Sequence, residues 1–166
     1  MKKILLITLF LHSLCNAQNA RPEREAFILK LAVDGEQYYN MEVNKTPYFV
    51  KEKILQIYPG DQLLIETEIK GDTIFSMKVV AENKFPKKTI LLNFAQEIEG
   101  RAHQQMMLSV TNPFDKSLIY DAAMYRIGKD SWSKTSIIPI RPGLINFETW
   151  ADIIITLVLE NWRFEI

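Results

Sequence analysis

The chain has 166 residues, 48% of them hydrophobic, and its 20 basic side chains balance its 20 acidic ones, which gives a formal net charge of zero. Nucleic-acid binding driven by counterion release needs a basic field, and this composition excludes one. A single cysteine also excludes a disulfide framework within the chain, so the stability of the fold must come from a packed core.

Residues 1–17 predict a secretory signal peptide. Lys2 and Lys3 form a basic start, residues 4–14 are mainly apolar, and small side chains precede a cleavage position after Ala17. The apolar run is too short to cross a hydrocarbon core about 30 Å thick, which takes about 20 helical residues. We therefore expect no transmembrane segment, but cleavage and export to the periplasm or to the outside of the cell.

Cys15 allows a second interpretation, in which a lipoprotein peptidase cuts before the cysteine and the new N-terminus is acylated. Such sites favour a branched apolar residue three positions before the cysteine and a small residue directly before it. His12 and Leu14 occupy these two positions instead. We expect an unmodified mature chain that begins at Gln18, with a lipid anchor on Cys15 as the alternative.

The remainder of the chain predicts a single domain, residues 26–166, after a flexible polar tail at residues 18–25. From Phe27 onward, apolar and polar residues alternate over short runs, and Gly, Pro, Asn or Asp separate the runs. This pattern is typical of an all-β sandwich or barrel. The predicted strands are 27–33, 39–43, an interrupted strand at 48–50 and 54–58, 63–69, 74–80, 89–96, 103–112, 118–127, 132–138 and 153–164.

Strands without long helical crossovers must pair in antiparallel fashion. A two-sheet antiparallel sandwich of immunoglobulin-like type fits this pattern best, and a closed up-and-down barrel is the alternative. The Gly-x-Trp triplet that is usual near the first strand of lipocalin-like barrels does not occur in the chain. Any helix should be a single turn, and residues 146–152 are the expected place for it.

Residue types that carry catalysis or bind metals are sparse. After signal-peptide cleavage His103 is the only histidine and no cysteine is left, so zinc sites built from several such residues are excluded. Glu66 and Glu68 project from one strand face about 7 Å apart, a separation that inverting glycosidases also use, but they have the pattern of solvated surface residues. We expect no catalytic residue, no metal site and no cofactor.

Aromatic side chains are the feature that favours a binding function. Partly exposed rings can stack on sugar or peptide faces, whereas buried rings fill the core of a sandwich. Tyr39 is in register with apolar residues and is expected in the core, while Tyr38 is expected outside. The predicted aromatic binding platform consists of Tyr38, Tyr48, Tyr58 and Trp132.

The C-terminal third contains a spaced set of residues that includes three short motifs. The set is Asn112-Pro113-Phe114, Trp132, Thr135-Ser136, Pro139, Pro142-Gly143-Leu144 and Phe147-Glu148-x-Trp150. It resembles a recurrent pattern in small, uncharacterised exported β-sandwich proteins of Gram-negative bacteria. The resemblance implies a β-sandwich in the periplasm or outside the cell, and it assigns no catalytic or binding residue.

These observations together predict an exported, non-catalytic β-sandwich that binds a protein or glycan partner. The alternatives are a carrier of a small apolar ligand and a hydrolase built from dispersed carboxylates. An interaction module should present an exposed apolar patch or an unpaired strand edge. A carrier should contain an enclosed pocket, and a hydrolase should bring two carboxylates together in a cleft. The sequence specifies neither the partner nor the oligomeric state.

Overall fold

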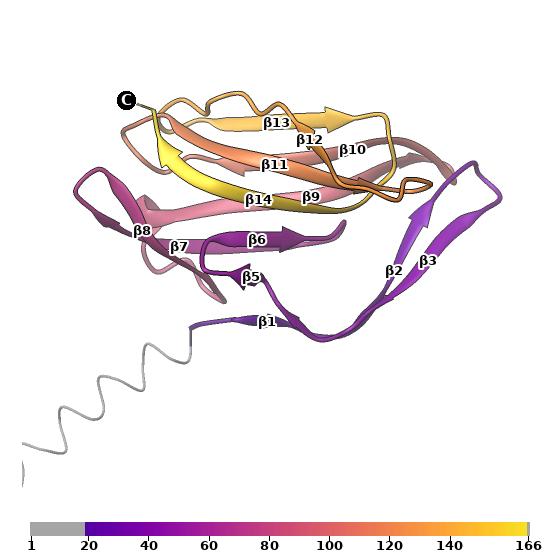
Figure 1. Ribbon diagram of the computed structural model, residues 1–166, viewed down its shortest axis with the longest axis horizontal. Coiled ribbons are helices and arrows are strands. Elements are labelled where there is room, and N and C mark those ends of the chain that lie inside the picture. Colours follow the sequence, from indigo (N-terminus) through magenta and orange to yellow (C-terminus); the bar gives the residue numbers. More distant parts are fainter. Residues whose placement is uncertain (1–18, 166) are drawn as a thin grey trace, which may run out of the picture.

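The computed structural model describes residues 19–165, so the predicted signal peptide and Cys15 lie outside the described residues. Two five-stranded antiparallel sheets make up most of the fold (Figure 1). This result confirms the predicted all-β class and the arrangement in two antiparallel sheets. Of residues 19–165, only Pro86–Lys88 (η1) are helical, so no helix in this range is long and apolar enough to cross a membrane.

Each sheet combines strands from distant parts of the sequence. Sheet I has the order β13 (Ile145–Trp150), β10 (Ala102–Thr111), β9 (Thr89–Glu99), β7 (Gln62–Lys70) and β8 (Thr73–Val80). Sheet II has the order β12 (Ser133–Thr135), β11 (Leu118–Arg126), β14 (Ile154–Phe164), β6 (Ile54–Ile57) and β5 (Phe49–Lys51). Two small two-stranded antiparallel sheets accompany them. One pairs β1 (Glu23–Arg24) with β4 (Thr46–Pro47), and the other is the hairpin of β2 (Phe27–Ala32) and β3 (Tyr38–Val43).

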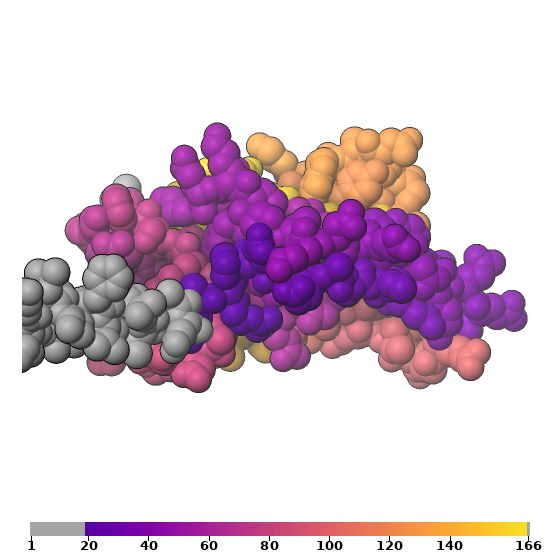
Figure 2. All heavy atoms as spheres, turned by 90° about the horizontal axis from the view of Figure 1, so that it is seen from below, coloured from indigo at the N-terminus to yellow at the C-terminus, as the bar shows by residue number. Residues whose placement is uncertain are grey.

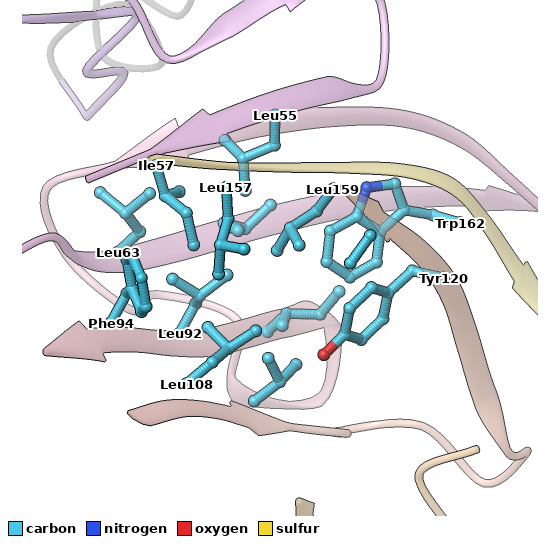
Figure 3. Close-up of a cluster of buried hydrophobic side chains, with 14 of the residues drawn as sticks. Leu55, Ile57, Leu63, Leu92, Phe94, Leu108, Tyr120, Leu157, Leu159 and Trp162 are labelled. Carbon is cyan, nitrogen blue, oxygen red and sulfur yellow. The ribbon is translucent and has the colours of Figure 1, made fainter. Parts of the chain in front are cut away.

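The main core lies between the two sheets, because successive side chains of a strand point to opposite faces. Leu92 and Phe94 of β9 and Leu157 and Leu159 of β14 all contribute inward side chains to it (Figure 3). Phe94, Leu157 and Leu159 have no measurable exposure. Full burial of a side chain of this size contributes about 1.5–3 kcal/mol, so the sandwich needs no covalent crosslink.

The hairpin of β2 and β3 closes one end of the sandwich (Figure 1). Leu29, Leu31 and Val43 of the hairpin form a second apolar cluster with Ile155 of β14. On the side of sheet I, the Gln96 amide completes the backbone pairing of the hairpin. Its Oε1 accepts a hydrogen bond from the Ala32 amide at 2.8 Å, and its Nε2 donates one to the Ala32 carbonyl at 2.9 Å.

Residues 19–24, which we call the N-terminal strap, lie along the edge between the two sheets. Ala20 forms an antiparallel bridge with Val80, and the Arg21 amide donates to the Val79 carbonyl at 2.7 Å. Figure 2 shows the indigo and purple N-terminal part across this side of the molecule. The polar composition predicted a flexible tail at 18–25, whereas the described part of that range is fastened to the domain.

Two local expectations were wrong. Residues 146–152 were expected to hold a helical turn, but Ile145–Trp150 is strand β13, which pairs with β10 along its whole length. Residues 48–50 and 54–58 were expected to form one interrupted strand. Here β5 and β6 instead pair with each other as a hairpin, and Glu52 between them adopts a left-handed φ of 41°.

Candidate interaction surface

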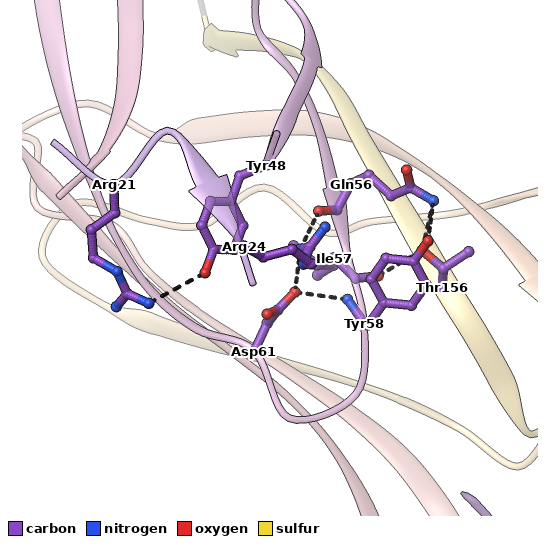
Figure 4. A network of polar contacts seen from close by, with 8 residues as sticks. All are labelled: Arg21, Arg24, Tyr48, Gln56, Ile57, Tyr58, Asp61 and Thr156. Carbon is purple, nitrogen blue, oxygen red and sulfur yellow. Dashed lines mark hydrogen bonds and ion pairs between the residues drawn. The ribbon is translucent and has the colours of Figure 1, made fainter. Parts of the chain in front are cut away.

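Two of the four predicted platform residues surround a guanidinium of the chain itself. The Arg24 guanidinium carbon lies 4.6 Å from the ring centroid of Tyr48 and 4.9 Å from that of Tyr58 (Figure 4). Tyr48 is only 4% exposed. Cation–π contacts of this kind are strongest when they are desolvated, so these rings hold the strap rather than offer a free surface for a ligand.

The polar contacts of Arg24 explain why this charge is buried. Its Nη2 donates to Asp61 Oδ2 at 2.6 Å and to the Gln56 carbonyl at 3.0 Å. The same Asp61 oxygen accepts a hydrogen bond from the Tyr58 amide at 2.9 Å. Arg24 is 3% exposed, so its ion pair with Asp61 is shielded from solvent. We call Arg24, Tyr48, Tyr58 and Asp61 the Arg24 slot, and it fixes the strap on the sandwich.

The other two predicted platform residues lie elsewhere. Tyr38 is half-buried on β3, with the Lys30 ammonium 4.1 Å from its ring centroid. Trp132 is 47% exposed and packs against Tyr125 at a centroid distance of 5.5 Å. The structure therefore does not assemble Tyr38, Tyr48, Tyr58 and Trp132 into one platform.

The carboxylates singled out in the sequence are both paired with lysines. Glu66 lies 2.9 Å from the Lys78 ammonium, and Glu68 lies 3.5 Å from that of Lys70. Ser76 also donates a hydrogen bond to Glu68 at 3.1 Å. Within residues 19–165, histidine, cysteine, aspartate and glutamate side chains form no group of three or more that could hold a metal ion.

The outer face of sheet II is polar and charged. Asn161 Nδ2 donates to Asp121 at 2.9 Å, and Arg163 Nη1 donates to the same carboxylate at 3.0 Å. These contacts, the one from Asn161 first, lower the pKa of Asp121 below its ordinary value. An open groove of about 560 Å³ beside them is lined by further charges, which include Lys51, Lys53 and Glu160.

The outer face of sheet I has the opposite character, because one row of mostly apolar side chains crosses all five strands. The strand registers place these residues side by side in the order Ile145, Thr111, Leu91, Leu64 and Val80. Ile145 is 53% exposed and Leu91 is 39% exposed. The row is polar at Thr111, and Val80 at the β8 edge is 1% exposed, so the exposed apolar part consists of Ile145, Leu91 and the half-buried Leu64. Exposed apolar patches of this kind are candidate surfaces for contact with another molecule.

The next row on this face combines smaller polar side chains with the aromatic ring of Phe147. It runs in the order Phe147, Ser109, Asn93 and Gln62. Phe147 is 59% exposed, and with the first row it borders an open groove of about 470 Å³. Among the described residues, Arg21 of the strap is the only charged one along this groove. We call these two rows the sheet I groove.

Two runs of consecutive apolar residues in the sequence indicate this surface. Leu63-Leu64-Ile65 and Ile90-Leu91-Leu92 are apolar at consecutive positions, so both faces of β7 and β9 carry apolar side chains. A strand with one solvated face should alternate instead. Leu64 and Leu91 were therefore identifiable as outward apolar residues, but their neighbours Ile145 and Phe147 belong to a strand that was not predicted.

Comparison of the chain with protein-family models, with curated protein sequences and with solved structures gives no match. The assignment of a function therefore depends on the geometry of these surfaces.

Proposed function

We propose that this chain is an exported, non-catalytic β-sandwich that binds a protein partner through the sheet I groove. The observation that carries the proposal is the apolar surface that Ile145, Leu91 and Leu64 form across sheet I, together with the exposed ring of Phe147. Interface centres are depleted in charged side chains and enriched in aromatic ones. The sheet I groove has this composition, whereas the outer face of sheet II does not.

The alternatives receive less support from the same geometry. A carrier of a small apolar ligand would enclose it, but the sheet I groove is open along the face of the sheet. A hydrolase would need two carboxylates that converge on a substrate, but Glu66 and Glu68 each contact a lysine. A glycan partner would favour exposed Tyr or Trp rings, and Trp132 is not part of the groove.

Export remains part of the proposal and is supported by the sequence of residues 1–17. The exported form should begin at Gln18 and carry no lipid. The intact mass of the protein recovered outside the cytoplasm measures this directly. A mass that corresponds to a diacylated N-terminal Cys15 would replace secretion by membrane anchoring.

We also propose that the sandwich is of immunoglobulin-like type. Two antiparallel sheets that enclose one apolar core support this proposal. An experimental structure would test it through the strand order of each sheet.

A photoreactive amino acid at position 147 tests the binding proposal. We expect irradiation of the exported protein in its own compartment to yield a protein adduct from this position. The matched control is position 28, because Ile28 is equally apolar and 68% exposed on β2, outside the groove. Equal adducts from both positions, or none from position 147, would contradict the assignment of the partner site.

A further inference from the structure

The size of the outer face of sheet I limits the interface that it can form. Five strands about 4.8 Å apart span about 24 Å, and about nine residues at about 3.4 Å each span about 30 Å. The whole face therefore offers about 700 Å² of area. The strands that extend to both sides of Asn93 are β13, β10 and β9, and they supply about 400 Å² of it, whereas stable complexes bury roughly 800 Å² per partner and weak ones less.

The two rows that flank the Asn93 row on this face differ in side-chain size, so each could pack against the other in a second copy. The row that lies two residues before Asn93 on β9 contains Ile145, Thr111 and Leu91 and is the bulkier one. Two residues to the other side is a row of mostly smaller side chains, Thr149, Met107 and Ala95. A twofold axis that lies across the strands at Asn93 would place Leu91 of one copy over Ala95 of the other, and Ile145 over Thr149.

Charged residues at the two ends of β9 obey the same symmetry. Lys87 and Lys88 precede β9 at one end, where Glu66 and Glu68 of the neighbouring strand β7 pair with Lys78 and Lys70. Glu97 and Glu99 occupy the outward positions of β9 at the other end, and Lys87 and Glu99 are equally far from Asn93 in sequence. The same axis would bring Lys87 and Lys88 of one copy over Glu97 and Glu99 of the other.

We propose that the partner of the sheet I groove is a second copy of this chain, packed outer face against outer face with the strands of the two copies antiparallel. The proposal rests on the proposed function and names its partner. The bulky rows would pack on the smaller ones, and the two Phe147 rings would meet close to the axis. An interface of this kind is isologous, so each contact occurs twice.

Sedimentation of the mature protein from about 1 to about 100 μM tests the proposal, since this range covers micromolar dimers. We expect a dimer for the unchanged chain and a monomer for Phe147→Glu, because two carboxylates would then face each other across the axis. Ile28→Glu is the matched control and should remain dimeric. At concentrations low enough for the unchanged chain to be monomeric, the thermal unfolding of Phe147→Glu should match that of the unchanged chain, since Phe147 is solvent-exposed in a single copy.

Charge reversal tests the antiparallel orientation itself. Lys87→Glu with Lys88→Glu should weaken dimerisation about tenfold, in line with like charges brought together across an interface. Adding Glu97→Lys and Glu99→Lys to the same chain should restore it. Restoration requires that the two ends face each other, which a change in stability alone would not produce.

The outcomes separate this inference from the proposed function. A monomer at every concentration, or a dimer that survives Phe147→Glu, would overturn the second copy as partner. The binding proposal would still stand if cross-linking from position 147 then captured a different protein. Failure of cross-linking from position 147 together with a monomeric chain would remove both.

Discussion

Two regions of the molecule bury polar side chains in different ways. In the Arg24 slot, a buried cation has an anionic partner in Asp61 and a ring on either side, while its Nε and Nη1 have no hydrogen-bond partner in the described part of the chain. In the main core, Tyr120 stacks on Trp162 at a centroid distance of 4.6 Å. The Tyr120 hydroxyl and the Trp162 indole nitrogen are buried without a hydrogen-bond partner in the described part of the chain.

The difference shows which buried polar groups determine the position of their side chain through hydrogen bonds and which belong to side chains that are positioned by apolar packing. The Arg24 guanidinium can be placed only where Asp61 and the Gln56 carbonyl accept its hydrogen bonds. The rings of Tyr120 and Trp162 could be placed by shape alone, since their polar atoms contribute no contact. Removal of a polar group should therefore be costly in the slot and nearly neutral in the core.

The largest effect is expected for Arg24→Met. The substitution leaves Asp61 largely buried without its cation, and breaking a buried ion pair in this way costs about 3–5 kcal/mol. The free energy of unfolding from urea titration measures the loss. Arg21→Met is the matched control in the same strap, because Arg21 is exposed and, within residues 19–165, its side chain makes a single hydrogen bond, to the Tyr48 hydroxyl at 3.4 Å. Equal losses in the two variants would mean that the slot does not fasten the strap.

The contacts of the Arg24 slot could not be predicted from the sequence. Tyr48 and Tyr58 were predicted to belong to an aromatic binding platform, because a single sequence does not show that Arg24 lies between their rings. Asp61 follows a Pro-Gly turn and had the pattern of an ordinary turn residue. The contacts that join Arg24 to Asp61 span 37 residues, and polar partners at such a separation leave no periodic signal.

Most of the strands, by contrast, were predicted from alternation alone, because burial of one face leaves a period of two in the sequence. Strand β13 was missed because its inward positions are Asn146, Glu148 and Trp150, which are less apolar than its outward positions Ile145 and Phe147. The inverted pattern concealed the strand, and with it Ile145 and Phe147 of the sheet I groove.

A smaller loss is expected for Asp61→Asn. The amide oxygen can still accept hydrogen bonds from Arg24 and from the Tyr58 amide, but the negative charge is gone. We expect a loss of about 1–3 kcal/mol in the free energy of unfolding, less than for Arg24→Met. A double-mutant cycle with Arg24→Met should show strong coupling between the two positions. Additive losses would indicate that each residue acts independently.

The core region should respond to alkaline pH. Burial first, and then the Glu148 carboxylate, raises the pKa of the Tyr120 phenol above its ordinary value. In the unfolded chain the phenol ionises at about pH 10, while in the folded protein it is still neutral at that pH. Its contribution to stability is fully present below about pH 10 and decreases by about 1.4 kcal/mol for each pH unit above that. The free energy of unfolding of Tyr120→Phe should lack this part of the decrease.

The smallest effect is expected for Tyr120→Phe at neutral pH. The ring keeps its stacking on Trp162, and the substitution removes a buried hydroxyl without a described partner. The free energy of unfolding should stay within about 1 kcal/mol of the original and should, if anything, increase, because the desolvation cost of the hydroxyl disappears. Tyr120→Leu is the control, since it removes the stacked ring and should be destabilising. A loss of more than about 2 kcal/mol for Tyr120→Phe would show that the hydroxyl is held by a contact and would place Tyr120 with Arg24 as a polar anchor.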